Sequence, residues 1–461
     1  MRTLIVHGTV VNASGVEPAD VLIDGEQIAA VGPGLAGDAV DRTIDAAGRL
    51  VIPGGVDIHT HMELPVGDVV SSDTFETGTR AAAFGGTTTI IDFATQTIGR
   101  PLAEGLEAWH VKADGHACID YGFHMAMNDV NDATLAEMDE LVREGVTSFK
   151  LFTAYPGRMY SDDGAILRAM FQAADNGGLI LIHAESGIAI DALADRYVRA
   201  GHTSPRYHGL SRPPTLEAEA IDRVSRMADV AGVPVYIVHL SSRDALEEVR
   251  RARERGTTVY AETCPQYLFL SDEDLARTDG AAGFVCSPPL RPRDHQEALW
   301  RGLETGDLQL VSTDHCPFDL AGPKTLGRDD FRLIPGGVPG VEERVDLVHD
   351  AGVVAGRISV ERWVELVSAG PARLAGLEGR KGVIAAGADA DVVIYDPRRR
   401  HTLSASTHHM RVDYSCYEGR VVQGGSDVVL SRGEVIVDHG RWLGRSGYGR
   451  FLKRAPVGRG A

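Results

Sequence analysis

The central part of the chain alternates short apolar runs with longer stretches of helical periodicity. Stretches such as EAEAIDRVSRMADVAG and SRDALEEVRRARERG follow runs that have the length of buried strands. Eight β-then-α units of this kind predict a parallel sheet closed as a (β/α)8 TIM-type barrel over residues 53–378. The predicted strands lie in GGVDIHTH, TTTIIDF, DYGFHMAM, TSFKLF, GLILIHA, PVYIVHL, TTVYAET and LQLVSTDH.

The two ends of the chain have a different pattern, in which short strand-like pieces are separated by Gly, Asp and Asn. Residues 1–52 contain LIVHGTVV, ADVLIDG, QIAAVG and RLVIPG, and residues 379–440 contain GADADVVIYDP, RVVQGGSDVVLSRG and EVIVDHG. This pattern is typical of short strands that are separated by turns. We expect both segments to form one small β-sandwich domain into which the barrel is inserted, with residues 441–461 as a C-terminal arm.

Composition and charge restrict the possible partners. The formal net charge of −19 disfavours nucleic acid and anionic membranes, and the chain has no basic run that would reverse this expectation. The N-terminus lacks the pattern of a signal peptide, and no uninterrupted apolar stretch is long enough to span a bilayer. The five scattered cysteines, an odd number without a CxxC pair, indicate reduced thiols and a cytoplasmic location.

Polar residues that could bind a metal follow several of the predicted strands. Because the carboxyl ends of barrel strands meet at one face, these side chains should converge there. A lone HxH pair, or one histidine after a strand, is more often a packed residue than a ligand. Several independent strands ending this way favour a metal centre. The residues are His59, His61, Lys150, His183, His239 and Asp314.

Lys150 is the unexpected member of this group, because an ammonium ion repels metal cations. Only five of the 46 basic residues are lysines, so the chain uses arginine for almost every other positive charge. Lysine can lose its proton when it is buried, whereas arginine effectively cannot. A neutral amine reacts with carbon dioxide to give a carbamate that can bridge two metals. We therefore predict N6-carboxylysine at Lys150, although an ordinary charged strand-end residue is the simpler interpretation.

The predicted ligands are imidazole and carboxylate groups without a thiolate. Such sites suit Zn, Mn, Co, Ni or Fe(II), and we expect two divalent ions per chain, zinc first among them. Two such ions activate water at neutral pH and polarise a carbonyl oxygen. The pattern therefore predicts a hydrolase.

The sequence resembles the cyclic amidohydrolases, and within them the hydantoinase/dihydropyrimidinase branch. The resemblance extends over nearly the whole chain. It rests on GGVDIHTHMELP, GTRAAAFGGTTTIIDF, SFKLFTAY, LIHAES, YHGLSRPPTLEAEA, VHLSS, AETCPQYL, SPPLR, STDHCPF, IPGGVPGVEER, GADADVVIYDP and THHMRVDYSCYEG.

The resemblance implies a role for each metal-site residue. His59 and His61 would hold one ion together with Asp314. The second ion would be held by His183 and His239. Carboxylated Lys150 would bridge the two ions.

The resemblance also implies the chemistry, which is the opening of a cyclic ureide or amide to an N-carbamoyl amino acid. Asp314 would carry the proton to the leaving ring nitrogen, and the phenol of Tyr155 would stabilise the oxyanion. Ser287 would hold the substrate, largely through its backbone. Gly336 stands where hydantoinases usually have an asparagine that helps to seat the ring.

The resemblance implies an apolar wall near the ring for the exocyclic substituent. Leu64, Phe152 and Met159 would form it, next to the less usual Pro156 and Arg158. The substrate remains open between dihydrouracil, dihydrothymine and 5-substituted hydantoins. Relatives of this kind form homotetramers, so the resemblance implies a homo-oligomer, a tetramer or a dimer.

Four other functions fit the sequence less well. A dihydroorotase has an arginine clamp after its HxH motif, and here Met62 and Glu63 follow instead. An allantoinase shares the ureide chemistry and is disfavoured more weakly, by the pocket loops. A non-catalytic interaction protein of the same fold would have lost the ligands, and a protein that merely stores zinc would need neither Tyr155 nor Asp314.

Overall fold

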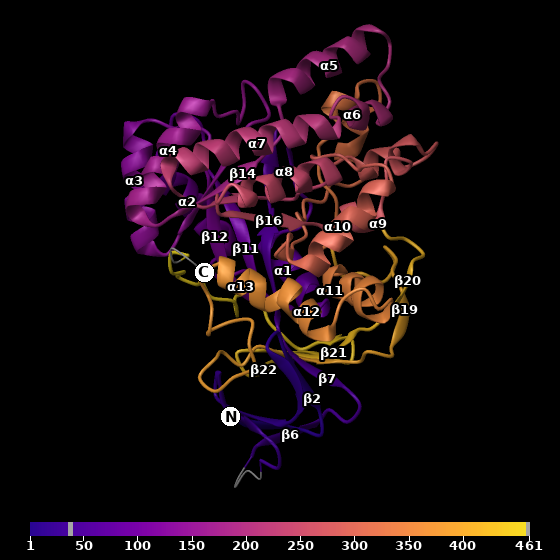
Figure 1. The fold of residues 1–461 in the computed structure, drawn as a ribbon. Helices are drawn as coiled ribbons and strands as arrows, with labels where there is room; N and C mark the ends of the chain where they lie inside the picture. The colour runs from indigo at the N-terminus through magenta and orange to yellow at the C-terminus, as the bar shows by residue number, and fades with distance from the viewer. Residues whose placement is uncertain (36–39, 458–461) are drawn as a thin grey trace.

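A computed structural model describes residues 1–35 and 40–457 and contains the expected barrel (Figure 1). Eight strands form one sheet in which each strand is hydrogen-bonded to the next in chain order, and these neighbours pair in parallel. The strands are β8 (Gly55–Thr60), β11 (Thr87–Thr95), β12 (Asp120–Ala126), β13 (Ser148–Phe152), β14 (Leu179–His183), β15 (Val235–Ile237), β16 (Val259–Thr263) and β17 (Leu310–Val311).

The first and last strands meet at the carboxyl end of the barrel. A parallel bridge pairs Thr60 with His315, and the backbone N–H of His61 donates to the carbonyl oxygen of His315 at 2.9 Å. This contact brings the end of β8 beside the segment that follows β17. It closes the ring of strands where the polar side chains gather.

The strands read as continuous apolar runs because both of their faces are buried. In β14, Ile180 and Ile182 pack in the cluster that includes the surrounding helices, and Leu179 and Leu181 pack in the barrel interior. His183 continues the alternation of Leu179 and Leu181, so its side chain follows theirs to the inner face. Local periodicity therefore already orients this candidate ligand.

Helices follow the strands and surround the barrel (Figure 1). Helix α3 shows how the sequence sets their limits, since Asn131 caps its first turn and Gly145, at φ 95°, ends it. The α-helices are α1 (Phe75–Phe84), α2 (Leu102–Ala113), α3 (Asp132–Glu144), α4 (Asp163–Asn176), α5 (Gly187–Arg199), α6 (Arg206–Leu210), α7 (Pro214–Ala231), α8 (Arg243–Glu254), α9 (Pro265–Phe269), α10 (Asp294–Thr305), α11 (Arg344–Val348), α12 (Val360–Val364) and α13 (Gly370–Leu374).

Strands from the two chain ends share a seven-stranded sheet, and a four-stranded sheet lies with it at the lower end of Figure 1. The larger sheet has the order β23 (Arg441–Trp442), β22 (Glu434–Asp438), β21 (Ser426–Ser431), β18 (Val392–Tyr395), β7 (Leu50–Pro53), β2 (Thr9–Asn12) and β3 (Gly15–Pro18). The smaller sheet has the order β5 (Gln27–Gly32), β4 (Asp20–Asp24), β1 (Arg2–Val6) and β6 (Arg42–Asp45).

The pairing of β7 with β18 joins segments that are far apart in sequence. The pairing is antiparallel and places Ile52 opposite Val393. A shared apolar cluster between the sheets takes Ile5 and Val21 from the N-terminal segment and Leu430 from the C-terminal one. This arrangement is the small strand-rich unit that the sequence predicts, while the division at residues 52, 378 and 440 stays a prediction.

The C-terminal arm packs against the barrel. Phe451 forms a parallel bridge with Tyr121, Leu452 is buried, and the guanidinium of Arg454 donates to the hydroxyl of Ser148 at 2.8 Å. Within the described residues, no helix is long and apolar enough to cross a membrane.

Lys381 connects the barrel to the terminal sheets. Its ammonium group is buried and lies 2.8 Å from Asp120 at the start of β12 and 2.7 Å from Asp391 beside β18. Asp389 lies 3.0 Å away, and Arg432 contacts Asp120 at 3.0 Å. Burial alone would lower the pKa of Lys381, but the carboxylates raise it above its usual range.

Replacement of Lys381 by methionine tests this junction. Lys381→Met leaves the buried carboxylate of Asp391 without its cation, whereas Asp120 keeps Arg432, so the free energy of unfolding should fall by about 3–5 kcal/mol in urea denaturation. Lys453 is exposed, and Lys453→Met should change stability by less than about 0.5 kcal/mol. Equal stability of the two variants would show that the junction does not depend on Lys381.

Candidate metal centre and active site

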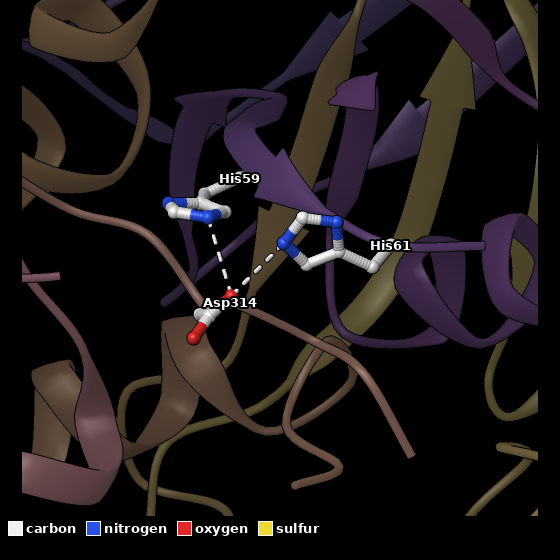
Figure 2. Close-up of side chains that lie close together, drawn as sticks. All are labelled: His59, His61 and Asp314. Atoms are coloured by element: carbon white, nitrogen blue, oxygen red, sulfur yellow. Dashed lines mark ion pairs between the residues drawn. The ribbon is translucent and has the colours of Figure 1, made fainter. Parts of the chain in front are cut away.

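Asp314 and two histidines form a compact group at the carboxyl end of the barrel. The Nε2 atoms of His59 and His61 lie 3.2 Å and 3.1 Å from the same carboxylate oxygen of Asp314 (Figure 2). Their ligand atoms all lie within 4.8 Å of one another. The two imidazoles therefore point to one space, as the spacing of the HxH motif predicts.

Lys150 lies directly beside this group. Its Nζ atom is 3.1 Å from Nε2 of His59 and 4.2 Å from the ring centroid of Phe93. Burial lowers the pKa of Lys150 to about 8, so a larger fraction of the amine is neutral near physiological pH than for an exposed lysine. Part of the Lys150 population is therefore neutral, at a position beside His59 where a carbamate could face the cluster.

His183 and His239 form the second predicted pair. Nδ1 of His183 lies 3.0 Å from Nε2 of His239, and the ring centroids of His239 and His59 are 5.3 Å apart. The pair therefore adjoins the Asp314 group. All six residues that the sequence predicts as ligands are brought together.

Two buried glutamates orient the imidazoles. Glu262 accepts from Nδ1 of His59 at 2.5 Å, and Glu185 accepts from Nε2 of His183 at 2.7 Å. A carboxylate at one ring nitrogen places the proton there and leaves the lone pair on the other. The free lone pairs then face Asp314 and His239, inside the cluster. This donor set fits divalent cations held by nitrogen and oxygen atoms.

A pocket of about 890 Å³ opens over the cluster. It has the size of a small-molecule site and combines apolar walls with a few polar groups. Burial raises the pKa of Tyr155 to about 12, although nearby Arg212 opposes the rise. The lining includes every residue that the sequence predicts for the substrate, namely Leu64, Phe152, Tyr155, Met159, Ser287 and Gly336.

Comparison with known proteins identifies the family. Residues 50–422 match the sequence profile described as the amidohydrolase family. The chain belongs to the amidohydrolase family. It is 58% identical over 459 residues to a D-hydantoinase of Streptomyces coelicolor, with 98% of each chain covered. It is 46% identical to a D-hydantoinase of Geobacillus stearothermophilus, with 99% of this chain and 98% of the relative covered.

Solved structures of such enzymes share the fold. A dihydropyrimidinase from Brevibacillus agri superposes with a TM-score of 0.98 at 44% identity, and 100% of both chains is covered. An L-hydantoinase from Arthrobacter aurescens has a TM-score of 0.89 at 28% identity, covering 98% of this chain and 99% of that one. The barrel with its strand-rich unit is therefore the architecture of this amidohydrolase, a hydrolase of cyclic amides from a metal-dependent family.

Buried counter-charges surround the centre of this amidohydrolase. Arg212 donates to Glu185 at 2.8 Å, and the hydroxyl of Tyr236 donates to Glu262 at 2.5 Å. Burial alone would raise the pKa of Glu185, but Arg212 and His183 hold it well below its usual range. Glu185, Arg212 and Glu262 lie in the motifs LIHAES, GLSRPP and AETCPQYL, and Tyr236 lies in PVYIVHL, but no local pattern indicates a role for them. Only the folded structure shows that they bond to the ligands or to one another.

Several site residues have a left-handed backbone. Tyr155 has φ 65°, His239 has φ 41° and Asp314 has φ 52°. Non-glycine residues in this region cost about 1–3 kcal/mol each and persist where the surrounding structure holds them. Their grouping in one pocket is the pattern expected of a functional site.

Removal of the charge at Glu262 tests whether this carboxylate orients the candidate metal ligand His59. Glu262→Gln keeps the shape but weakens the acceptor for His59, so zinc affinity should fall about 10–100-fold in chelator competition. Glu343→Gln is the matched control, a buried carboxyl that lies beside Ser415. Unchanged zinc affinity in Glu262→Gln would contradict the orienting role.

Two adjacent glycines of the pocket should respond differently to substitution. A Cβ on Gly336 would lie 3.8 Å from the hydroxyl of Ser287, an ordinary contact. Gly337 has φ 142°, and its Cβ would lie 2.2 Å from the carbonyl oxygen of Cys316. Gly336→Asn should therefore change stability by less than about 0.5 kcal/mol, whereas Gly337→Asn should cost at least about 1–3 kcal/mol in thermal unfolding. The reverse order would be inconsistent with this pocket geometry.

Proposed function

We propose that this amidohydrolase opens the ring of 5-substituted hydantoins or dihydropyrimidines to give N-carbamoyl amino acids. The observation that supports this most strongly is the convergence of six potential ligands beneath a pocket that contains Tyr155 and Ser287. The names of the relatives, D-hydantoinase and dihydropyrimidinase, agree with this substrate class.

The proposed cofactor is a pair of divalent ions. His59, His61 and Asp314 would hold one ion, and His183 with His239 the other. Zinc is proposed first, and Mn, Co, Ni or Fe(II) would suit the same ligands. Lys150, carboxylated by carbon dioxide to N6-carboxylysine, would lie between the two ions. When bound, the metals would supply activated water and carbonyl polarisation.

The protein's own side chains would perform the remaining steps. Because the pKa of Tyr155 is raised to about 12, its phenol stays protonated and can donate to the negative charge that develops on the ring carbonyl oxygen. Asp314 would carry a proton to the leaving ring nitrogen. Ser287 and Gly336 would hold the ring through their main chain.

The apolar wall would receive the exocyclic group of the substrate. Leu64, Phe152 and Met159 all line the pocket. A bulky 5-substituent would remove their apolar surface from water, which favours binding by about 25 cal/mol per Å². The wall is therefore the proposed determinant of preference between hydantoins and dihydropyrimidines.

The assembly and location of the enzyme are also proposals. We expect a cytoplasmic homo-oligomer, a dimer or a tetramer, that acts on a small molecule. All five cysteines are free and buried, which agrees with a reducing compartment. Allantoinase activity is the alternative enzymatic reading, and a non-catalytic role is disfavoured because every ligand position is filled.

Ring opening by the zinc-supplemented protein tests the proposal. Dihydrouracil, a 5-aryl hydantoin and allantoin should be assayed side by side for their ring-opened products. We expect turnover of dihydrouracil or the hydantoin to exceed that of allantoin. Preferential opening of allantoin would replace the proposed function with the alternative, and opening of none would reject the substrate class.

Lys150→Arg tests the proposed carbamate. Arginine cannot become neutral, so it cannot form a carbamate, and its charge repels the ions. Bound metal, measured by plasma emission after gel filtration, should fall from two ions per chain to one or none, and ring opening should be lost. Thermal unfolding serves as the control for folding. A folded Lys150→Arg protein with full metal content would exclude the carbamate.

A further inference from the structure

Lys324 is a second buried lysine beside the pocket, and the mechanism above does not use it. It lies in the short 3-10 helix η3 (Pro323–Gly327) and is 1% exposed. Its ammonium group donates to the carbonyl oxygens of Val285 at 3.1 Å, Pro335 at 2.8 Å and Gly337 at 2.8 Å. An ammonium group has three donors, and these contacts use all of them.

The three carbonyl groups belong to the two chain segments that bring Ser287 and Gly336 to the pocket. Val285 lies two residues before Ser287, while Pro335 and Gly337 flank Gly336 on both sides. The N–H of Gly337 also donates to the carbonyl oxygen of Val285 at 2.9 Å. Lys324 therefore joins the Ser287 segment to the Gly336 segment at one point.

Other donors hold the peptide groups around Ser287. Nε2 of His208 donates to the carbonyl oxygen of Cys286 at 2.8 Å, and the hydroxyl of Tyr267 donates to that of Pro288 at 2.8 Å. Together with Lys324 they hold the carbonyl groups of residues 285, 286 and 288. The main chain at Ser287 is consequently fixed from both sides.

The burial of the Lys324 ammonium group has a high free-energy cost for a lysine with only a structural role. Across residues 1–35 and 40–457, no carboxylate lies within ion-pair distance of its ammonium group. Burying a cation without a carboxylate is unfavourable, and only hydrogen bonds to the carbonyl groups offset that cost. Lys381, in contrast, is surrounded by carboxylates at the opposite end of β12 from the pocket.

We propose that Lys324 is a positioning residue that fixes the Ser287 and Gly336 segments at the separation needed to hold the substrate ring. It acts through the main chain of both segments and touches neither substrate nor metal. This inference rests on the proposed function for its kinetic consequence. Its structural consequence can be measured without substrate.

Lys324→Met provides the kinetic test, because methionine has a similar shape but no donor. A loosened support weakens ground-state and transition-state binding of the ring alike, so KM should rise by about 10-fold to 100-fold while kcat changes by less than about threefold. Metal content should stay at the wild-type value. A rise in KM no larger than that of the control below would overturn the proposal.

Lys381→Met is the matched control, since it also removes a buried ammonium group. It should lose stability but keep the wild-type KM, which separates positioning from general destabilisation. Lys324→Gln retains two of the donors without the charge, and its KM should lie between those of wild type and Lys324→Met. This variant keeps the test available if Lys324→Met does not fold.

Hydrogen exchange of the metal-loaded protein tests the positioning independently of turnover. Peptides that cover residues 285–288 and 335–337 should exchange faster in Lys324→Met or Lys324→Gln than in wild type and Lys381→Met. Unchanged exchange would overturn the proposal. If wild type opens no ring but these peptides respond, the proposed function fails and the positioning role stands.

Discussion

Closure of the barrel between β8 and the segment after β17 is the constraint on which the rest of the structure depends. The bridge from Thr60 to His315 brings His59 and His61 to one carboxylate oxygen of Asp314, although about 250 residues separate the two histidines from Asp314 in sequence. In a barrel the carboxyl ends of all strands lie at one rim. The remaining candidate ligands therefore reach the site if the alternation of side chains along their strands points them inward. The pocket, its strained backbone and the proposed chemistry all lie on this rim.

Buried charge is the main energetic cost of such a site. Isolated ions are expensive in a protein interior and persist when they are paired and hydrogen-bonded. Here Glu262 pairs with His59, Glu185 lies between His183 and Arg212, and burial weakens the proton affinity of Lys150. The lone pairs and the amine are thereby prepared for a cation, as expected of a metal-dependent family.

Local sequence patterns were sufficient to predict the barrel and the convergence of the six candidate ligands, because strand periodicity determines which end and which face a residue occupies. The joining of the terminal strands was also predicted, because both ends of the chain contain short strand-like pieces separated by Gly, Asp and Asn. The bonds of Glu262, Arg212 and Lys324 were not predicted, since they join elements whose proximity no local pattern encodes.

The most direct test of the central claim is anomalous diffraction from crystals of the zinc-loaded protein, recorded on both sides of the zinc absorption edge. A two-metal centre predicts two peaks in the difference map. One should lie beside His59, His61 and Asp314, and the other beside His183 and His239, with additional density extending from Nζ of Lys150 between them. A single peak with an unmodified lysine, or no peak at the cluster, would contradict it.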